Sequence, residues 1–405
     1  MNQASTVTLD FNPLAPEVTA NPYPFYDRFR SAAPVFKTPL GRWFLTRHSD
    51  VSLVLRDRRF GRTFAVNSQK TYGPDALKEP SQAAISRMML FMDPPDHARV
   101  RGLFAKAFSP RRMEEMRSRI QSIADRLIDD VEPRGQMDVV ADFAYRLPII
   151  VTCEMLGIPD EDRTQCLASF RMSGRMIDAL PMNGDEMKQA NEQVLFLERY
   201  FHGLFELRRR EPRNDLTTHL LQVEEAGDKL TGPELTANVI LIFAAGYETT
   251  SNFIGNALLA LYKHPRELER VKADPTIWPQ AIDELLRYDG SVQFGSRTAL
   301  EDVELDGNLI KKGDIVVNSI GAANRDPAVY PDPNRLDLTR ENVRPLSFGG
   351  GIHTCLGAQL ARMETEIALS TLLRRLPNLQ LHDLDQPNWM QSFIWRGLRS
   401  LRATW

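Results

Sequence analysis

The sequence predicts a mainly α-helical protein with a few short strands in small sheets. Helical patterns dominate residues 97–207, and the longest candidate helix runs from about Thr231 to His264. Its start, TGPE, has the form of a capping box with Thr231 and Glu234 three positions apart, and Pro265 ends it. The centre of this helix is apolar on most faces, so we expect it to be buried and to cross the core.

The N-terminal part alternates helical and strand-like segments. Residues 21–32 and 49–57 have helical patterns, and WFLT at 43–46 between them has the pattern of a strand. The stretch from Gly61 to about Ala84 is polar and weakly patterned, which is typical of a mobile loop.

The part after the long helix predicts two short helices and a hairpin. The helices are expected near residues 266–273 and 279–288, and 303–317 has the pattern of two strands joined at Asp306-Gly307. No repeat, low-complexity tract or Gly/Ser linker divides the 405 residues, so we expect one domain over residues 1–405.

Composition and charge exclude several function classes. The formal net charge of −3 provides no basic excess, so nucleic acid is not an expected partner. The first 35 residues contain no continuous apolar stretch, and we expect neither a signal peptide nor a membrane anchor. Three cysteines form no even disulfide framework, which favours a reducing, cytoplasmic location.

One cysteine stands between a glycine-rich loop and a strongly patterned helix. Residues 348–357 read FGGGIHTCLG, and apolar residues recur at helical spacing from there to Pro377. The aligned dipoles and unpaired N–H groups of a helix N-terminus favour an anion, so they lower the pKa of the Cys355 thiol. The glycines would let a large flat ligand approach the sulfur. The alternative is a buried, inert thiol, but the full pattern indicates a metal site with a sulfur ligand.

This constellation resembles the haem-thiolate signature of the cytochrome P450 monooxygenases, and the likeness to soluble bacterial members covers nearly the whole chain. The resemblance implies a single-domain fold with the long helix over the haem and Cys355 as the iron ligand. It also implies haem b and O2 as cofactors, with two electrons from NAD(P)H delivered through partner proteins.

Glu248 and Thr249 interrupt the apolar centre of the long helix, in AAGYETT. Buried polar groups need partners, so the threonine either bonds a carbonyl one turn back or is placed for chemistry. The resemblance implies the second role, because the family uses an acid–alcohol pair to deliver protons beside bound oxygen. Gly246 is then expected to be a place where the helix opens.

Three charged residues are assigned to structure. Glu284 and Arg287, in DELLRY, are three positions apart on one helical face and can pair. The resemblance implies that Arg335 completes this group and supports the cysteine loop. Leu336 departs from the phenylalanine that the family usually has after this arginine.

Four cationic or imidazole side chains are candidates for contacts with the haem propionates. A buried haem needs such partners for its two carboxylates. Each residue alone is more readily a surface residue or a satisfied core histidine, but the resemblance implies that all four contact propionate. They are His97, Arg101, Arg297 and His353.

The resemblance also implies that several short segments contact the substrate. Their residues are mostly apolar, which favours a largely hydrophobic substrate. They are Met88, Met89, Leu90, Leu241, Ala244, Ala245, Val292, Gln293, Phe294, Phe393 and Ile394.

We therefore expect a monomeric monooxygenase that hydroxylates or epoxidises a hydrophobic small molecule. A polyketide-like or fatty-acyl compound of secondary metabolism, free or bound to a carrier protein, is the expected substrate. The chain has no GxGxxG fingerprint, so electrons are expected from a ferredoxin or flavodoxin with its reductase. The alternatives are a peroxide-driven peroxygenase and a non-catalytic haem-thiolate sensor or binding protein.

A basic cluster is a candidate docking surface for the acidic electron donor, by charge complementarity. The alternative is an ordinary solvated basic helix. The cluster consists of Arg99, Arg101, Lys106, Arg111 and Arg112.

Overall fold

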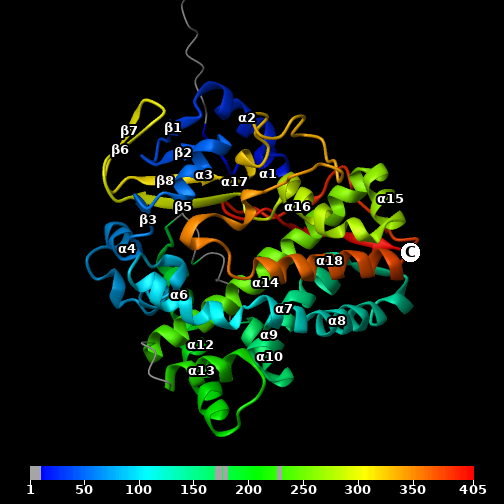
Figure 1. The fold of residues 1–405 in the computed structure, drawn as a ribbon, viewed down its shortest axis with the longest axis horizontal. Helices are drawn as coiled ribbons and strands as arrows, with labels where there is room; N and C mark the ends of the chain where they lie inside the picture. The colour runs from blue at the N-terminus through cyan, green and yellow to red at the C-terminus, as the bar shows by residue number, and fades with distance from the viewer. Residues whose placement is uncertain (1–10, 169–175, 177–180, 226–229) are drawn as a thin grey trace, which may run out of the picture. The chain divides into compact units, whose positions relative to one another are not determined.

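The computed structural model describes residues 11–168, 176, 181–225 and 230–405, which fall into two compact units (Figure 1). Unit 1 holds residues up to 61, 255–354 and 383–401, and unit 2 holds the described residues of 62–254, 355–382 and 402–405. Helices hold most of the described residues and the strands are short, so the predicted mainly α class is confirmed.

Unit 1 contains a five-stranded sheet in the order β1-β2-β8-β5-β3, in which only the β2–β8 pair is parallel. In Figure 1 the N-terminal strands β1 and β2 lie beside β8 and β5, which come from a much later part of the chain. All three residues of β2 are buried, as its apolar sequence WFL requires. The strands are β1 (Val35–Lys37), β2 (Trp43–Leu45), β3 (Phe60–Gly61), β5 (Phe294–Ala299) and β8 (Ile315–Ser319).

The hairpin predicted within residues 303–317 is β6 (Val303–Leu305) and β7 (Asn308–Ile310). Asp306 and Gly307 both have positive φ, 52° and 70°, as in a two-residue hairpin turn of type I′. The remaining elements of unit 1 are α1 (Pro16–Ala20), α2 (Tyr23–Ala32), α3 (His48–Arg56), α15 (Pro265–Ala273), η6 (Pro275–Ile277), α16 (Trp278–Asp289), α17 (Ile320–Ala323), η7 (Leu346–Phe348), η8 (Gly351–His353), β10 (Asn388–Trp389) and β11 (Leu398–Ser400).

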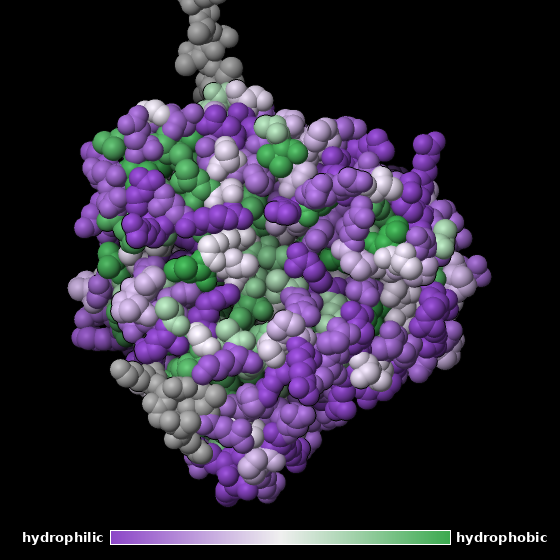
Figure 2. All heavy atoms as spheres, viewed as in Figure 1, coloured by the Kyte–Doolittle hydropathy of each residue, from purple (hydrophilic) through white to green (hydrophobic). Residues whose placement is uncertain are grey.

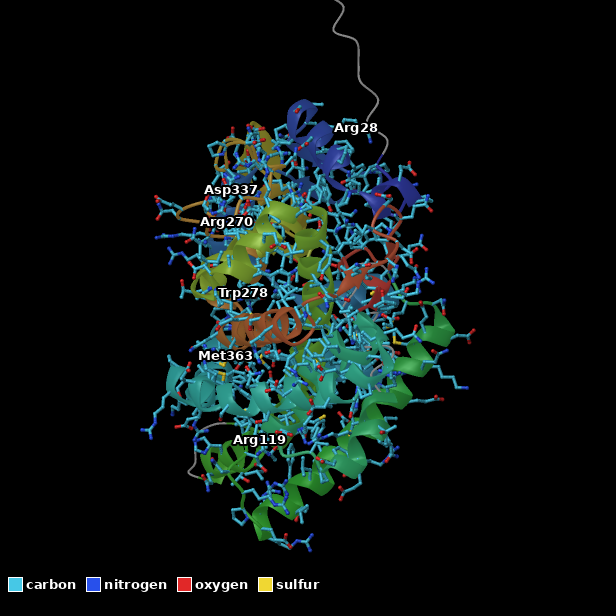
Figure 3. The ribbon with its side chains drawn as sticks, turned by 90° about the vertical axis from the view of Figure 1, so that its right-hand side faces the viewer. Arg28, Arg119, Arg270, Trp278, Asp337 and Met363 are labelled. Atoms are coloured by element: carbon cyan, nitrogen blue, oxygen red, sulfur yellow. The ribbon has the colours of Figure 1, made fainter. Side chains whose placement is uncertain are left out.

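Unit 2 is built mainly from helices. The helix that follows Cys355, α18 (Ala358–Arg375), packs along α8 (Arg117–Asp129), and the two lie side by side in Figure 1. Figure 3 labels Met363, a buried residue of α18. The other elements are α4 (Phe64–Tyr72), η1 (Ala76–Lys78), α5 (Pro80–Ser86), η2 (Met89–Phe91), α6 (Asp96–Ala107), α7 (Pro110–Glu115), η3 (Glu132–Arg134), β4 (Gln136–Asp138), the π-helix η4 (Val139–Ala144), α9 (Arg146–Leu156), η5 (Asp160–Asp162), α10 (Arg163–Ala168), α12 (Gly184–Arg210), α13 (Leu216–Glu225), β9 (Gln380–Leu381) and β12 (Arg402–Thr404).

The longest helix, α14 (Gly232–Lys263), begins in unit 2 and ends in unit 1. The predicted capping box is present. The backbone N–H of Thr231 donates to Glu234 Oε2 at 2.9 Å, and the backbone N–H of Glu234 donates to Thr231 Oγ1 at 3.4 Å. Most of the helix is buried, as its apolar sequence predicts.

The interpretation of residues 61–84 as a mobile loop is wrong, because the segment contains α4, η1 and α5. Polar residues such as Gln69, Lys70 and Asp75 are exposed, but two serines of the segment are buried and bond distant side chains. Ser68 donates to Gln82 Oε1 at 2.8 Å, and Ser81 Oγ donates to Asn191 Oδ1 at 2.7 Å. Such long-range polar partners are not visible in local periodicity.

Hydrophilic residues cover most of the face of the molecule that Figure 2 shows, and apolar residues are gathered in smaller areas. Across the described ranges of the chain, we find no helix with the length and apolar character needed to cross a membrane.

Candidate active site

Cys355 lies three residues before α18, and its side chain is exposed, whereas Cys153 and Cys166 are buried. Desolvation raises the pKa of the Cys355 thiol, while the backbone N–H of Gly357 and the charges of Arg101 and Arg362 lower it. The predicted position just before a helix is confirmed. The expected lowering of the thiol pKa is not, because desolvation outweighs the Gly357 N–H and the charges of Arg101 and Arg362.

The glycine-rich loop that precedes Cys355 belongs to unit 1. At Gly351 the backbone has φ of 66°, and an added Cβ would come within 2.6 Å of the Leu55 carbonyl oxygen. A side chain at this position would therefore be strained and would collide with α3. Close packing of the loop against α3 is the reason for this glycine.

One turn near the middle of α14, residues 244–249, is accessible on one side, and we call it the open turn. Ala245 is exposed, and Ala244, Glu248 and Thr249 are half-buried, although the preceding turns of the helix are buried. Small side chains at this turn leave accessible space beside the helix. The Thr249 hydroxyl donates to the Ala245 carbonyl oxygen at 3.3 Å. The bond to a carbonyl one turn back, one of the two alternatives from the sequence, is therefore formed.

Gly246 does not open the helix, because α14 is continuous through this residue. An added Cβ would come within 2.6 Å of Thr152 Oγ1, so the glycine lets α9 approach α14 closely. The expectation that the helix opens at Gly246 is therefore wrong, and this glycine serves close helix packing.

Glu248 is a perturbed acid, since desolvation raises the pKa of its carboxyl to about 7. Nothing in the sequence pattern indicated its neighbour Tyr145, whose ring lies 5.4 Å from that of Tyr247 in an edge-on contact. The pKa of Tyr145 is raised by desolvation and also by the charge of Glu248, so the phenol and the carboxyl lie within electrostatic reach. Tyr145 is 42% exposed and so brings solvent contact near Glu248.

The four candidates for propionate contact are divided between the units. His97 and Arg101 lie one turn apart on α6 in unit 2, and His97 is buried. Desolvation lowers the pKa of Arg101, while the charge of Cys355 raises it, which places this arginine near the sulfur. In unit 1, Arg297 is buried on β5 and His353 is half-buried in η8.

Glu284 and Arg287 form the predicted pair, in a bidentate contact at 2.6 and 2.8 Å between fully buried side chains. Arg287 also donates to the carbonyl oxygens of Asn324, Pro333 and Arg335. These bonds tie α16 to the segment that leads to the cysteine loop.

The role expected of the Arg335 guanidinium belongs to Arg340. The side chain of Arg335 is 62% exposed and pairs with Asp337, whereas the Arg340 side chain reaches Glu284 at 3.4 Å. The backbone N–H of Asp337 also donates to Glu284 at 3.0 Å. Figure 3 labels Asp337 and Arg270 of α15. Arg270 donates to the Glu267 carboxylate, which also accepts the backbone N–H of Leu338. The arginine that reaches Glu284 lies five residues after the one that the motif indicated.

The expected substrate contacts differ in accessibility. In unit 2, Met88, Met89 and Leu241 are buried, while Leu90 is half-buried. In unit 1, Phe294 and Phe393 are buried and stack on each other with ring centroids 4.6 Å apart.

Gln293 is bonded within unit 1, where its backbone N–H donates to the Ile394 carbonyl oxygen at 2.9 Å. Val292 and Ile394 are half-buried. The Gln293 side chain donates to the Gly290 carbonyl oxygen at 2.8 Å and accepts the Tyr26 hydroxyl at 2.9 Å. These two bonds hold the Gln293 side chain in place at the start of β5.

Several cations of the basic cluster have partners within unit 2. Arg99 pairs with Glu234 and Asp96, Arg111 pairs with Glu115, and Arg112 contacts the His219 ring. Arg101 interacts electrostatically with Cys355. Glu234 and His219, which pair with Arg99 and Arg112, come from distant helices and are not visible in local sequence.

A family model described as cytochrome P450 matches residues 65–275 and 276–396. The chain is a cytochrome P450. A protein of Xylella fastidiosa assigned to cytochrome P450 133B2 is 42% identical over 389 residues, covering 96% of this chain and 97% of the relative. The polyketide biosynthesis cytochrome P450 PksS of Bacillus subtilis is 38% identical, covering 97% and 98%.

The fold of this cytochrome P450 also matches solved structures. The crystal structure of P450BioI in complex with acyl carrier protein ligated to hexadec-9Z-enoic acid has a TM-score of 0.90 and 35% identity. It covers 96% of this chain and all of that chain, 100%. The predicted family, fold and enzyme class are therefore confirmed, and cytochrome P450 monooxygenases use haem iron and O2.

Proposed function

We propose that this cytochrome P450 binds haem b through Cys355 and hydroxylates or epoxidises a hydrophobic polyketide-like or fatty-acyl molecule. The observation that carries the proposal is the accessible Cys355 sulfur before α18, with the Gly357 N–H and the Arg101 charge directed to it. Residues 1–405 act as one domain and a monomer in this proposal. The free thiols of the three cysteines support a reducing, cytoplasmic setting.

The donor set fits a haem. A thiolate is a suitable iron ligand, and a desolvated arginine four residues after a buried histidine suits carboxylates that leave water. Cys355 would hold the iron, and His97, Arg101, Arg297 and His353 would hold the propionates. O2 activation and transfer of one oxygen atom to carbon are the chemistry that haem supplies when bound.

In this proposal Glu248 and Thr249 supply protons to the site at the open turn of α14. A carboxyl whose pKa is about 7 both holds and releases a proton near neutral pH, which is the property required of a proton donor. Thr249 is the next residue of the open turn, and its hydroxyl oxygen can accept a hydrogen bond from that acid, directly or through water. Ala244 and Ala245 leave space for the substrate beside it.

Replacing Glu248 by glutamine is expected to reduce coupling of electron consumption to product. The acid form of Glu248 declines as pH rises through about 7, so wild-type coupling should fall over that range. The glutamine variant should lack this pH dependence and make product roughly one to two orders of magnitude more slowly. Product and peroxide are measured per NAD(P)H oxidised from pH 6 to 9.

Thr249→Ala provides the companion change and should release more peroxide with haem retained. Thr250→Val is the matched control, because Thr250 is buried on another face of α14 and should leave coupling unchanged. Unchanged coupling in both Glu248→Gln and Thr249→Ala would remove the proton role from this pair.

The proposed substrate class rests on the site and on the relatives. The open turn is lined by alanines, and the half-buried Leu90 adds apolar surface in the same unit. PksS is named for polyketide biosynthesis, and P450BioI was solved with a fatty-acyl chain on a carrier protein. Turnover of such chains with a ferredoxin or flavodoxin system tests the proposal, whereas turnover with peroxide alone would favour a peroxygenase.

The electron donor is proposed to dock beside the cysteine loop of unit 1. Ile352 in this loop is 53% exposed, and the neighbouring Gly350 lies against Arg56, with its Cβ position 3.2 Å from Arg56 Cζ. Arg56 is exposed, and its guanidinium donates to the carbonyl and hydroxyl oxygens of Ser52 on its own helix. An apolar side chain beside an exposed cation fits an acidic ferredoxin or flavodoxin.

Arg56→Glu is expected to slow electron transfer from an acidic ferredoxin by about three- to tenfold at low ionic strength, because it reverses an attractive charge. The difference should shrink at high salt, where the charges are screened. Arg28→Glu, an exposed arginine of α2 labelled in Figure 3, changes the net charge equally and should leave the rate near wild type. Stopped-flow reduction of both variants is the measurement, and equal rates would exclude Arg56 from the docking surface.

A further inference from the structure

Asn238, on the second turn of α14, makes three hydrogen bonds while fully buried. Its side chain Nδ2 donates to the Arg87 carbonyl oxygen at 2.9 Å and to the Glu234 carbonyl oxygen at 2.8 Å. Its Oδ1 accepts the backbone N–H of Met89 at 2.7 Å. The side chain is 0% exposed, and all of these groups belong to unit 2.

The amide of Asn238 matches the segment that it binds. An asparagine amide has two N–H donors and one carbonyl acceptor, and here both kinds of group bond backbone that lies about 150 residues earlier in the chain. A buried polar side chain costs free energy unless it is bonded, so this arrangement is stable only with Arg87 and Met89 in place. Asn238 therefore acts as a clamp between α14 and the segment that enters η2 (Met89–Phe91).

The clamp lies on the same face of α14 as the open turn. Asn238, Leu241 and Ala245 are spaced i, i+3 and i+7, so their side chains share one stripe. At about 1.5 Å per residue, the clamp is on the order of 10 Å from Ala245 along the helix. A second contact joins the same end of α14 to this region. Arg99 of α6 pairs with Glu234 of α14, and η2 packs against α6.

The clamp also explains why the residues of this segment differ in burial. Met88 and Met89 are 4% and 5% exposed and so belong to the core, whereas Leu90 keeps accessible surface. Holding the backbone at Arg87 and Met89 restricts the position of the next residue, Leu90.

We propose that Asn238 is a positioning residue that holds residues 87–91 against α14 and thereby fixes the wall of the site for a long apolar substrate. The inference rests on the proposed function, because it assigns the open turn of α14 to substrate. It adds a specificity role for a residue that touches neither the sulfur nor the proposed proton donors.

The test uses the haem-loaded full chain with Asn238→Leu and Asn238→Asp. The leucine removes all three bonds, whereas the aspartate keeps the acceptor for Met89 N–H and loses the donor to the Arg87 carbonyl. Hydrogen exchange of residues 86–92 without ligand should rise in both variants, and more in the leucine variant. The Kd for hexadec-9Z-enoic acid, from the spectral shift, should rise about tenfold in the leucine variant, while the Kd for imidazole stays within twofold.

Thr236→Val is the matched control, because Thr236 is also buried on this helix and its hydroxyl donates within the helix, to the Gly232 carbonyl oxygen at 3.0 Å. It should leave both the exchange and the Kd unchanged. Wild-type exchange of residues 86–92 in Asn238→Leu would overturn the clamp. Faster exchange with an unchanged Kd would overturn its role in substrate positioning. If wild-type protein does not bind the acid, the fatty-chain class fails, and the exchange measurement still decides the clamp.

Discussion

Replacing Cys355 by serine is expected to abolish monooxygenase turnover and the thiolate-type carbon monoxide difference spectrum. A neutral hydroxyl does not replace an anionic sulfur as a soft iron ligand. Activity should fall by about three orders of magnitude or more, as for other groups without which the chemistry does not proceed. The measurement is the reduced carbon monoxide spectrum together with product formation in a reconstituted electron-transfer system.

Cys153→Ala is the matched control for this experiment. Cys153 is buried in the same unit, and desolvation raises the pKa of its thiol to about 12, so it stays protonated. Its replacement should leave the spectrum and the haem content unchanged. A Cys355→Ser protein that keeps the thiolate spectrum, or a Cys153→Ala protein that loses it, would overturn the assignment of the iron ligand.

Removing the Arg287 side chain is expected to have the largest effect on stability. Arg287→Ala would leave the Glu284 carboxylate buried and would strip three carbonyl oxygens of their donor. Breaking one side of a buried ion pair costs about 3–5 kcal/mol. The midpoint of urea unfolding should fall accordingly, and Glu284→Gln, which keeps the shape of the side chain, offers a milder variant if Arg287→Ala does not fold.

Two further arginines make this prediction specific. Arg335→Ala should change the unfolding free energy by no more than about 0.5 kcal/mol, because that side chain is exposed and its pair is on the surface. Arg340→Ala should cost about 1–3 kcal/mol, because it removes a mostly buried partner of Glu284. A loss at Arg335 larger than that at Arg340 would restore the motif-based assignment and contradict the geometry.

The contrast between Arg335 and Arg340 shows where sequence inference ended. Glu284 and Arg287 were predictable because partners three residues apart on a helix are set by helix geometry. The third arginine lies in an irregular segment, where a displacement of five residues changes which guanidinium reaches Glu284. Only the path of the backbone, fixed by contacts such as Asp337 N–H to Glu284, decides that.

The same limit applies to polar segments. Residues 61–84 lacked helical periodicity because Ser68 and Ser81 are turned inward to Gln82 and Asn191. The basic cluster looked free because Glu234 and His219, which occupy Arg99 and Arg112, are more than a hundred residues away. Hydrogen bonds of this kind depend on tertiary packing and leave no local signal.

The sequence by itself determined the cysteine before α18, the long capped helix with Glu248 and Thr249, and the family to which these belong. Each is a local feature, since spacing, capping and glycine placement act within a few turns of chain. Tertiary structure alone decided which cations are occupied, that Gly246 admits Thr152 instead of opening the helix, and that Asn238 binds the segment before Leu90. These outcomes depend on which distant groups meet in the folded chain, and burial makes each unpaired alternative costly.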